Sequence, residues 1–159
     1  MTIRVLCVGR VRERFFQDAA GEYMKRLTRY AKIEICEVPD EKAPENLSEA
    51  DRKLVLKKEG DRLLAKIREQ DYVIALAVNG TPMSSELFAA RIGALMNSGK
   101  SSIAFVIGGS LGLSGDVQRR ADEAISFSAM TFPHQLMRVI LLEQIYRAEK
   151  ILSGEPYHK

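Results

Sequence analysis

Short apolar runs alternate along the chain with longer segments that are apolar on one side only. Five runs, several rich in β-branched residues, have the length and composition of buried strands: residues 2–9, 32–39, 72–78, 102–108 and 124–128. The third run is expected to end at the turn pair Asn79-Gly80. Strands that alternate with helices are typical of a parallel α/β sheet with helices on both faces, and we predict this fold class.

The segments between these runs show helical spacing. Phe15, Ala19 and Tyr23 recur at every fourth position and predict an amphipathic helix over residues 13–30. Further helices are predicted over residues 48–69, 84–96, 115–122 and 133–153, the first of them capped by Ser48. No internal repeat or low-complexity segment divides the sequence, so residues 1–159 are expected to form one domain.

The last predicted helix is apolar over more than one face. Its apolar positions are Leu136, Met137, Val139, Ile140, Leu141, Leu142 and Ile145. A helix of this kind needs burial on two sides, against its own sheet and against something else. In a chain of this size the natural partner is a second copy, so we expect a homodimer.

Composition and charge are those of a globular protein, with 46% hydrophobic residues, 28% charged residues and a net charge of +3. This charge allows a nucleic-acid partner without requiring one. The basic residues Arg10, Arg12 and Arg14 cluster just after the first predicted strand. They form either a solvated surface or a surface that contacts phosphates, and charge alone leaves both interpretations open.

Several classes of site have no support in the sequence. Cys7 and Cys36 lie in apolar runs and form neither a disulfide framework nor a metal set, and neither histidine has metal-ligand company, so no metal is expected. No segment approaches the roughly 18 consecutive apolar residues of a membrane span, and the N-terminus lacks the pattern of a signal peptide. We therefore expect a soluble, cytoplasmic protein that does not insert in a membrane.

A glycine-rich stretch, FVIGGSLGLSGDV at residues 105–117, follows the fourth predicted strand. No Lys-Ser/Thr pair follows the glycines, so this is not a Walker A loop. The dinucleotide-binding pattern belongs on the first strand–helix turn, where the sequence VGRVRERF has a single glycine. A tight turn and a nucleotide-binding module stay open, although the absence of Lys and Arg within residues 105–117 argues against the second.

Three predicted strand ends share an unusual composition. They are LAVNG at residues 76–80, IGGSLG at residues 107–112 and FSAMTFPHQ at residues 127–135. In open α/β sheets, ligands bind beyond the carboxyl ends of the strands. Because these segments carry no Asp, Glu, Lys or Arg, they favour a pocket that holds its ligand by backbone hydrogen bonds and apolar packing.

The chain also resembles a known family. The stretches VIGGSLGLS, SFSAMTFPHQLMRVILLEQIYRA and GEPYHK, together with KEGDRLL and LMNSGK, are similar to those of the SPOUT-superfamily ribosomal RNA methyltransferases. These enzymes methylate N3 of a pseudouridine in large-subunit (23S) ribosomal RNA. The resemblance covers essentially the whole chain. It implies an α/β fold with a C-terminal trefoil knot, a homodimer, S-adenosylmethionine bound in the knot, and the assembled ribosome as substrate.

The resemblance also implies which residues bind the cofactor. By position these are Leu76, Gly108, Phe127, Ser128, Ala129, Met130, Thr131 and Phe132. The chain departs from the family pattern at Ala77, Thr81, Ser110 and Leu111. These departures spare a pocket built from backbone, but they leave open a second interpretation, a non-catalytic dimer that binds RNA or the ribosome.

Methylation of N3 requires that this nitrogen lose its proton, so a nearby base or cation would help. His134 and Arg138, one helical turn apart, are candidates; their alternatives are a structural hydrogen bond and a salt bridge. The terminal residues Tyr157, His158 and Lys159 would be disordered on composition alone. The resemblance instead gives this tail a part in substrate binding and catalysis.

Overall fold

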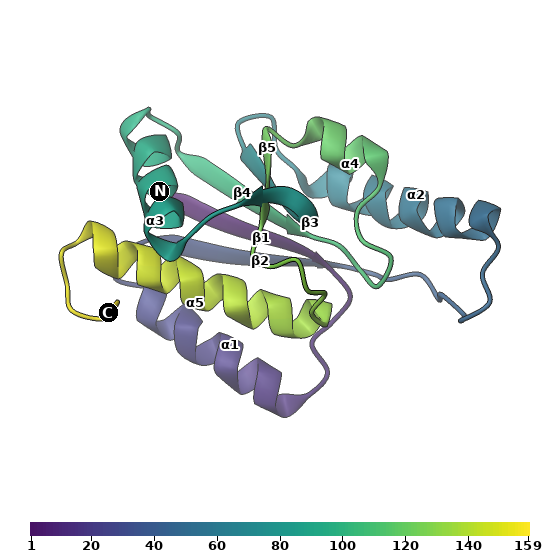
Figure 1. Cartoon of the computed structure of the whole chain (residues 1–159), viewed down its shortest axis with the longest axis horizontal. Coiled ribbons are helices and arrows are strands. Elements are labelled where there is room, and N and C mark those ends of the chain that lie inside the picture. The colour runs from purple at the N-terminus through teal and green to yellow at the C-terminus, as the bar shows by residue number, and fades with distance from the viewer.

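Helices and strands alternate strictly along the chain. The computed structural model describes residues 1–159 (Figure 1). The elements are β1 (Thr2–Val8), α1 (Arg14–Leu27), β2 (Lys32–Val38), α2 (Glu49–Lys66), β3 (Tyr72–Pro82), α3 (Ser85–Asn97), β4 (Ser102–Ile107), α4 (Gly115–Arg120), β5 (Glu123–Ser126) and α5 (His134–Leu152). All strand pairs are parallel, in the order β2-β1-β4-β3-β5, which confirms the predicted α/β class.

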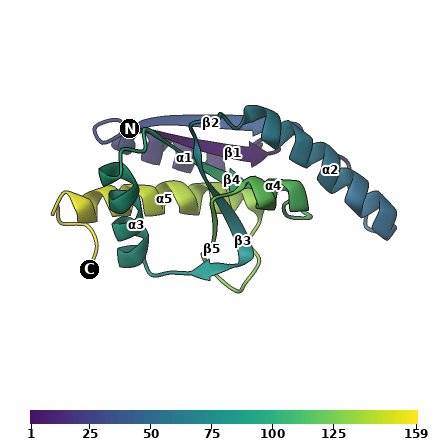
Figure 2. The ribbon, with the colours of Figure 1, turned by 90° about the horizontal axis from the view of Figure 1, so that it is seen from above.

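The sheet is covered by helices on both faces. On one face the core joins Leu27 of α1, Ile92 of α3 and Leu142 of α5, and α1 and α5 lie side by side in Figure 1. On the other face Leu63 of α2 and Val117 of α4 pack on the sheet, and Figure 2 shows α2 projecting beyond it. Burial on two faces explains why the strands are continuous apolar runs in the sequence.

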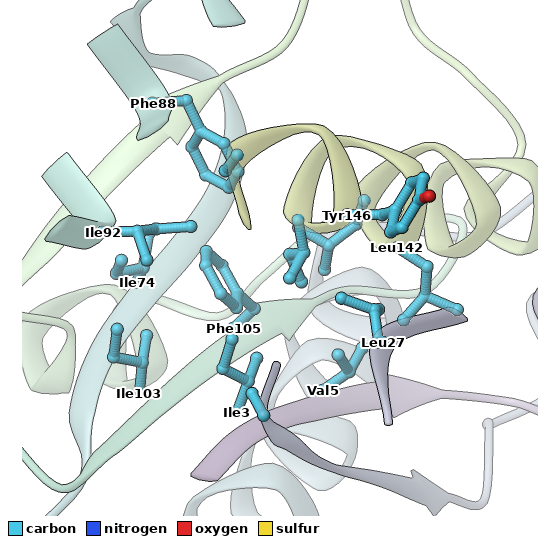
Figure 3. Packing of buried hydrophobic residues seen from close by; sticks show 14 of the residues in the cluster. Ile3, Val5, Leu27, Ile74, Phe88, Ile92, Ile103, Phe105, Leu142 and Tyr146 are labelled. Atoms are coloured by element: carbon cyan, nitrogen blue, oxygen red, sulfur yellow. The ribbon is translucent and has the colours of Figure 1, made fainter. Parts of the chain in front are cut away.

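The centre of the sheet is the best-packed part of the molecule. Every residue of β4 is buried. The ring of Phe105 points toward Phe88 of α3, with the ring centroids 5.9 Å apart (Figure 3). Alternate residues of β1 serve the two cores, Val5 on the α5 side and Leu6 on the α2 side. The packing of β1 and β4 therefore fixes where the carboxyl ends of these two strands lie.

Strand β3 does not end at Asn79-Gly80, as the sequence predicted, but continues to Pro82. Leu76 pairs with Ile125 of β5, the chain bulges outward, and Thr81 then pairs with the same Ile125. A Cβ atom at Gly80 would lie 2.6 Å from the Ile125 backbone. Glycine is needed here because any side chain would push the two segments apart.

Helix α5 buries one side and leaves another partly free. Leu141, Leu142 and Ile145 are fully buried in the core, whereas Leu136 and Ile140 are only half-buried. The chain alone therefore covers one of the two apolar sides that the sequence predicted. No helix of the structure combines the length and apolar character needed to cross a membrane.

Two glycine substitutions should change stability in opposite directions. Gly80→Ala places a methyl group against the Ile125 backbone and should lower the free energy of unfolding by about 1–3 kcal/mol, the usual cost of overpacking. Gly21→Ala, in α1 where nothing lies within 4 Å, should raise it by about 0.5–1 kcal/mol. Urea unfolding measures both. Equal effects would contradict the close approach at Gly80.

Candidate functional site

A cavity of about 630 Å³ opens at the bulge of β3 and the carboxyl ends of β4 and β5. We call it the strand-end cavity. Three segments line it: residues 76–79 at the bulge within β3, the glycine stretch 107–112 at the end of β4, and residues 126–134 from the end of β5. Its volume falls in the range of small-molecule pockets, about 300–1,000 Å³. The three strand ends singled out in the sequence are therefore the walls of one cavity.

The predicted cofactor contacts gather in this cavity, with one exception. The lining includes Leu76, Gly108, Phe127, Ser128, Met130, Thr131 and Phe132. Ala129 is exposed and does not line it. The sequence did not single out Met137 of α5 as a residue of the cavity, which it also lines. Its signal was the helical spacing that places it one turn after Pro133.

The strand-end cavity contains no Asp, Glu, Lys or Arg side chain. The segment after β5 is held by its own hydrogen bonds: Ser126 Oγ donates to the Ser128 carbonyl at 2.9 Å, and the Met130 amide donates to Ser128 Oγ at 2.9 Å. The polar groups available to a ligand are hydroxyls, the Asn79 amide, the His134 imidazole and backbone groups. This composition matches the uncharged pocket expected from the sequence.

Glycines let the backbone fold tightly at the wall after β4. The Gly112 amide donates to the Gly109 carbonyl at 3.0 Å, and Gly112 has a φ of 86°. A Cβ atom at Gly108 would lie 2.3 Å from the Gly112 carbonyl oxygen. This wall therefore requires a residue without a side chain at position 108 and a left-handed backbone conformation at position 112.

A buried carboxyl group lies behind this wall. Glu59 of α2 is 4% exposed, and a Cβ atom at Gly109 would lie 3.1 Å from its Oε1. Its Oε2 accepts a hydrogen bond from the Glu41 amide, whereas Oε1 has no partner. Burial raises the pKa of Glu59, and the neighbouring Asp40 adds to this effect.

The sequence did not single out Glu59 as a functional residue. A signal was present, because Glu59 stands four residues after Val55 and four before Leu63, both of which are buried on the sheet side of α2. A carboxyl group in the apolar stripe of an amphipathic helix is unusual and therefore informative. The next residue, Gly60, allows α2 to approach Ser114, the N-cap of α4.

Among the four candidate catalytic residues, His134 lies in the strand-end cavity. It is the first residue of α5 and is half-buried. Burial lowers its pKa, and the charge of Arg138 lowers it further. The imidazole is therefore neutral over a wider range of pH than a free histidine and keeps one nitrogen able to accept a proton.

Arg138 lies beneath the cavity and not on its surface. It is 3% exposed, and it donates to Glu37 Oε2 at 2.8 Å and to the Gly9 carbonyl at 3.1 Å. The salt bridge considered as its alternative is therefore present. A direct contact with a substrate phosphate is not available to a side chain this deeply buried. Arg138 can act on the site through the ends of β1 and α5 that it joins.

The C-terminal tail is ordered, contrary to what its composition alone predicted. Tyr157 packs its ring on Tyr146, with centroids 4.9 Å apart, and donates to Glu143 Oε1 at 3.1 Å. Burial and Glu143 raise the pKa of Tyr157 to about 12. His158 Nε2 lies 2.7 Å from Glu86, and this hydrogen bond lowers the pKa of Glu86 to about 2. Aromatic and polar contacts thus hold the tail on the molecule.

The tail and the strand-end cavity lie at opposite ends of α5. The helix has 19 residues and is about 28 Å long, at about 1.5 Å per residue. His134 begins it, and Tyr157 follows its last turn. The structure therefore does not bring the tail residues together with His134 within one chain. It also holds no group of three or more His, Cys, Asp or Glu side chains placed to bind a metal ion.

Comparison with known proteins bears on the chemistry of this cavity. A family described as "Predicted SPOUT methyltransferase" matches residues 1–158. Proteins named "Ribosomal RNA large subunit methyltransferase H" from Shouchella clausii, Bacillus cytotoxicus and Bacillus anthracis are 59%, 57% and 55% identical, each over the full length of both chains.

Two solved structures share the fold at low sequence identity. One is a probable methylase family protein from Haemophilus influenzae, with a TM-score of 0.57 and 15% identity over 99% of this chain and 70% of that one. The other is a putative methylase family protein from Neisseria gonorrhoeae, with a TM-score of 0.53 and 12% identity over 99% of this chain and 85% of that one.

The substitution Glu59→Gln should change how stability depends on pH. Between the ordinary glutamate pKa of 4.5 and the raised pKa of Glu59, the folded chain keeps a proton that the unfolded chain has lost, so wild-type stability falls as pH rises. The variant lacks this fall, so its free energy of unfolding should gain on that of the wild type as pH rises above the ordinary glutamate pKa of 4.5. Urea unfolding at each pH measures the difference.

A matched control for this experiment is Glu49→Gln, because Glu49 is exposed on the same helix. Its stability curve should run parallel to that of the wild type. The interpretation of Glu59 as a buried carboxyl without a full set of partners fails if the Glu59→Gln curve is also parallel.

Proposed function

The chain belongs to the SPOUT methyltransferase family, and we propose that it transfers the methyl group of S-adenosylmethionine to N3 of a pseudouridine in large-subunit ribosomal RNA. The observation that carries the proposal is the strand-end cavity, which gathers all but one of the cofactor contacts implied by the family resemblance. The names of the full-length relatives support ribosomal RNA as the substrate. The proposal includes the cytoplasm as the site of action and one methyltransferase domain over residues 1–159.

The residues of the cavity fit S-adenosylmethionine. No Lys or Arg side chain lines the cavity, so no fixed positive charge opposes a sulfonium cation there. At Gly112 nothing lies within 4 Å of a Cβ position, and the lining glycines leave their main-chain groups uncovered by side chains. When bound, S-adenosylmethionine supplies an activated methyl group. The protein's part is then to position the acceptor nitrogen and exclude water.

His134 is proposed to take the proton from N3. It lies at the cavity, and burial favours its neutral form, which is the form that accepts a proton. Arg138 is proposed as a positioning residue: its contacts with Glu37 and Gly9 fix the start of α5, and with it His134.

The tail is proposed to act in the cavity of a second copy of the chain. Tyr157 and His158 are held about one helix length from their own cavity. The half-buried apolar residues Leu136 and Ile140 lie near the other end of α5 and are the proposed dimer contact. A dimer formed through this part of α5 gives each tail a route to its partner's cavity.

A C-terminal knot is also part of the proposal. Its support is the chain path around β5: β3 pairs with Ile125 on both sides of the bulge at residues 77–80, and the segment after β5 passes on to α5 on the opposite face from α4. Residues 76–79 and residues 126–128 line the same cavity on the two sides of this path.

Labelled methyl donor tests the function. The protein is incubated with labelled S-adenosylmethionine and ribosomes from a strain that lacks the gene, and the modified nucleoside is mapped. We expect label in N3-methylpseudouridine of large-subunit RNA, and donor binding by calorimetry. Donor binding without transfer would favour the non-catalytic RNA-binding alternative. Binding of nucleotides without binding of the donor would favour the nucleotide-binding module.

Deletion of residues 157–159 should separate stability, donor binding and turnover. The loss of Tyr157 removes its packing on Tyr146, so thermal stability should fall modestly. Donor affinity should be unchanged because no tail residue lines the cavity. Turnover on ribosomes should fall on the order of a hundredfold, the effect of about an ångström of misplacement.

A mixing experiment tests whether the tail acts in the partner subunit. The tail deletion and His134→Gln are each inactive in this proposal, but in a mixed dimer one cavity has both an intact His134 and an intact tail from the other chain. The two variants are mixed, unfolded and refolded together, which should restore part of the activity. No restoration, with mixed dimers confirmed by mass spectrometry, would contradict a shared site.

A further inference from the structure

The arginine side chains of this protein divide into two groups. Most make an ion pair with Asp or Glu, on every face of the molecule and whether buried or exposed. Arg10, Arg12, Arg14 and Arg52 make none. Three of these exceptions fall within residues 10–14, which lead from β1 to Arg14, the first residue of α1. We call this segment the arginine loop.

The arginine loop lies beside the strand-end cavity. Gln135 Nε2 on α5 donates to the Arg10 carbonyl at 3.3 Å. The preceding residue, Gly9, has its carbonyl bound by Arg138, and a Cβ atom on it would lie 3.5 Å from His134 Nε2. In Figure 1 this connection passes next to the start of α5. The arginine loop therefore begins directly after Gly9, which lies next to the cavity residue His134.

Nearby acids do not neutralise this loop. Glu13 is the one acid within it, and its side chain makes no ion pair. Glu37 is engaged by Arg138 and by the Val11 amide, at 2.8 and 3.3 Å. The first turn of α1 contains no acidic residue, and no side chain caps it. Three exposed, unpaired positive charges thus face solvent with a single negative charge in the same segment.

An exposed aromatic ring accompanies these charges. Phe15 follows Arg14 directly and is 66% exposed, one of the largest exposures of a hydrophobic side chain in the chain. Its ring rests on Phe16, with centroids 4.5 Å apart, and Phe16 is half-buried. The face of the Phe15 ring that points away from Phe16 is therefore free, and the contact with Phe16 helps to fix the orientation of the ring. Burying such a face against a flat ring is favourable.

We propose that the arginine loop and Phe15 form a docking surface for the single-stranded RNA that flanks the target nucleotide. The arginines bind successive phosphates, and Phe15 stacks on an unpaired base. This inference rests on the proposed function, since it places the flanking strand beside the cavity that holds the reacting base. Arginines with aromatic platforms are the usual means of binding single-stranded RNA, and phosphate contacts fix its register.

Methyl transfer to ribosomes tests the surface through the split between KM and kcat. Replacing Arg10, Arg12 and Arg14 with Ala should raise KM for ribosomes at least about tenfold, while kcat and donor affinity stay at wild-type values. The slope of log(kcat/KM) against log salt should become less steep by about two, since each lost single-strand phosphate contact removes about 0.7. Phe15→Ala should raise KM about fivefold or more, the effect of one lost stacking contact.

The control removes the same charge elsewhere. Lys57, Lys58 and Arg119 lie exposed on α2 and α4, on the other face of the sheet, and are replaced with Ala together. This variant should keep the wild-type KM and salt slope. A direct measurement accompanies the kinetics: fluorescence anisotropy of a labelled 20-nucleotide polyuridine at about 50 mM salt, with each variant.

Three results would overturn the inference. The first is an unchanged KM, salt slope and polyuridine affinity in the triple arginine variant. The second is loss of the dimer in that variant by light scattering, which would make the surface an interface between copies of the chain. The third is binding of polyglutamate as tight as that of polyuridine, with Phe15→Ala leaving both affinities unchanged. If the wild type transfers no methyl group, the proposed function fails, and the polyuridine measurement still decides whether this surface binds RNA.

Discussion

The pairing of β3 with β5 on both sides of a bulge is the constraint on which the strand-end cavity depends. Ile125 pairs first with Leu76 and then with Thr81, and the residues between them are forced outward to form one wall. The same strand leads directly into residues 127–132, the facing wall. Because both walls start from one strand position, the width of the cavity is set by main-chain hydrogen bonds, and Gly80 is the residue that lets the two segments meet.

Charge is sorted around this cavity by depth. The lining has no carboxylate or cation, and the two titratable groups nearest to it, His134 and Glu59, both have pKa values shifted toward their neutral forms by burial. Below the lining, the buried Arg138 is paired with Glu37, whose side chain is exposed on its other side. The unpaired arginines lie outside, in solvent. An uncharged interior with cations at its rim suits a reaction in which the donor itself brings positive charge and the acceptor is part of a polyanion.

The sequence predicted the local features well and the distant contacts poorly. The order of strands and helices, the helix cap at Ser48 and the meeting of three strand ends followed from periodicity and from the geometry of parallel sheets. The continuation of β3 past Gly80 depends on a contact with Ile125, and the burial of Arg138 depends on Glu37, 101 residues away. No local pattern encodes such contacts. The individual cofactor contacts came from resemblance to a family, because no local pattern in the sequence assigns them.

Helix α5 places a geometric condition on any reaction that uses both of its ends. His134 is its first residue, and Tyr157 is fixed beyond its last turn by Tyr146 and Glu143. A packed helix about 28 Å long does not bend enough to join them, since its buried side holds Leu142 and Ile145 in the core. Chemistry that needs both ends must therefore draw them from two chains. In a twofold dimer the contact is reciprocal, so that a tail reaching one cavity implies the same at the other. Dimer formation would then be a requirement of the active site and not only a source of stability.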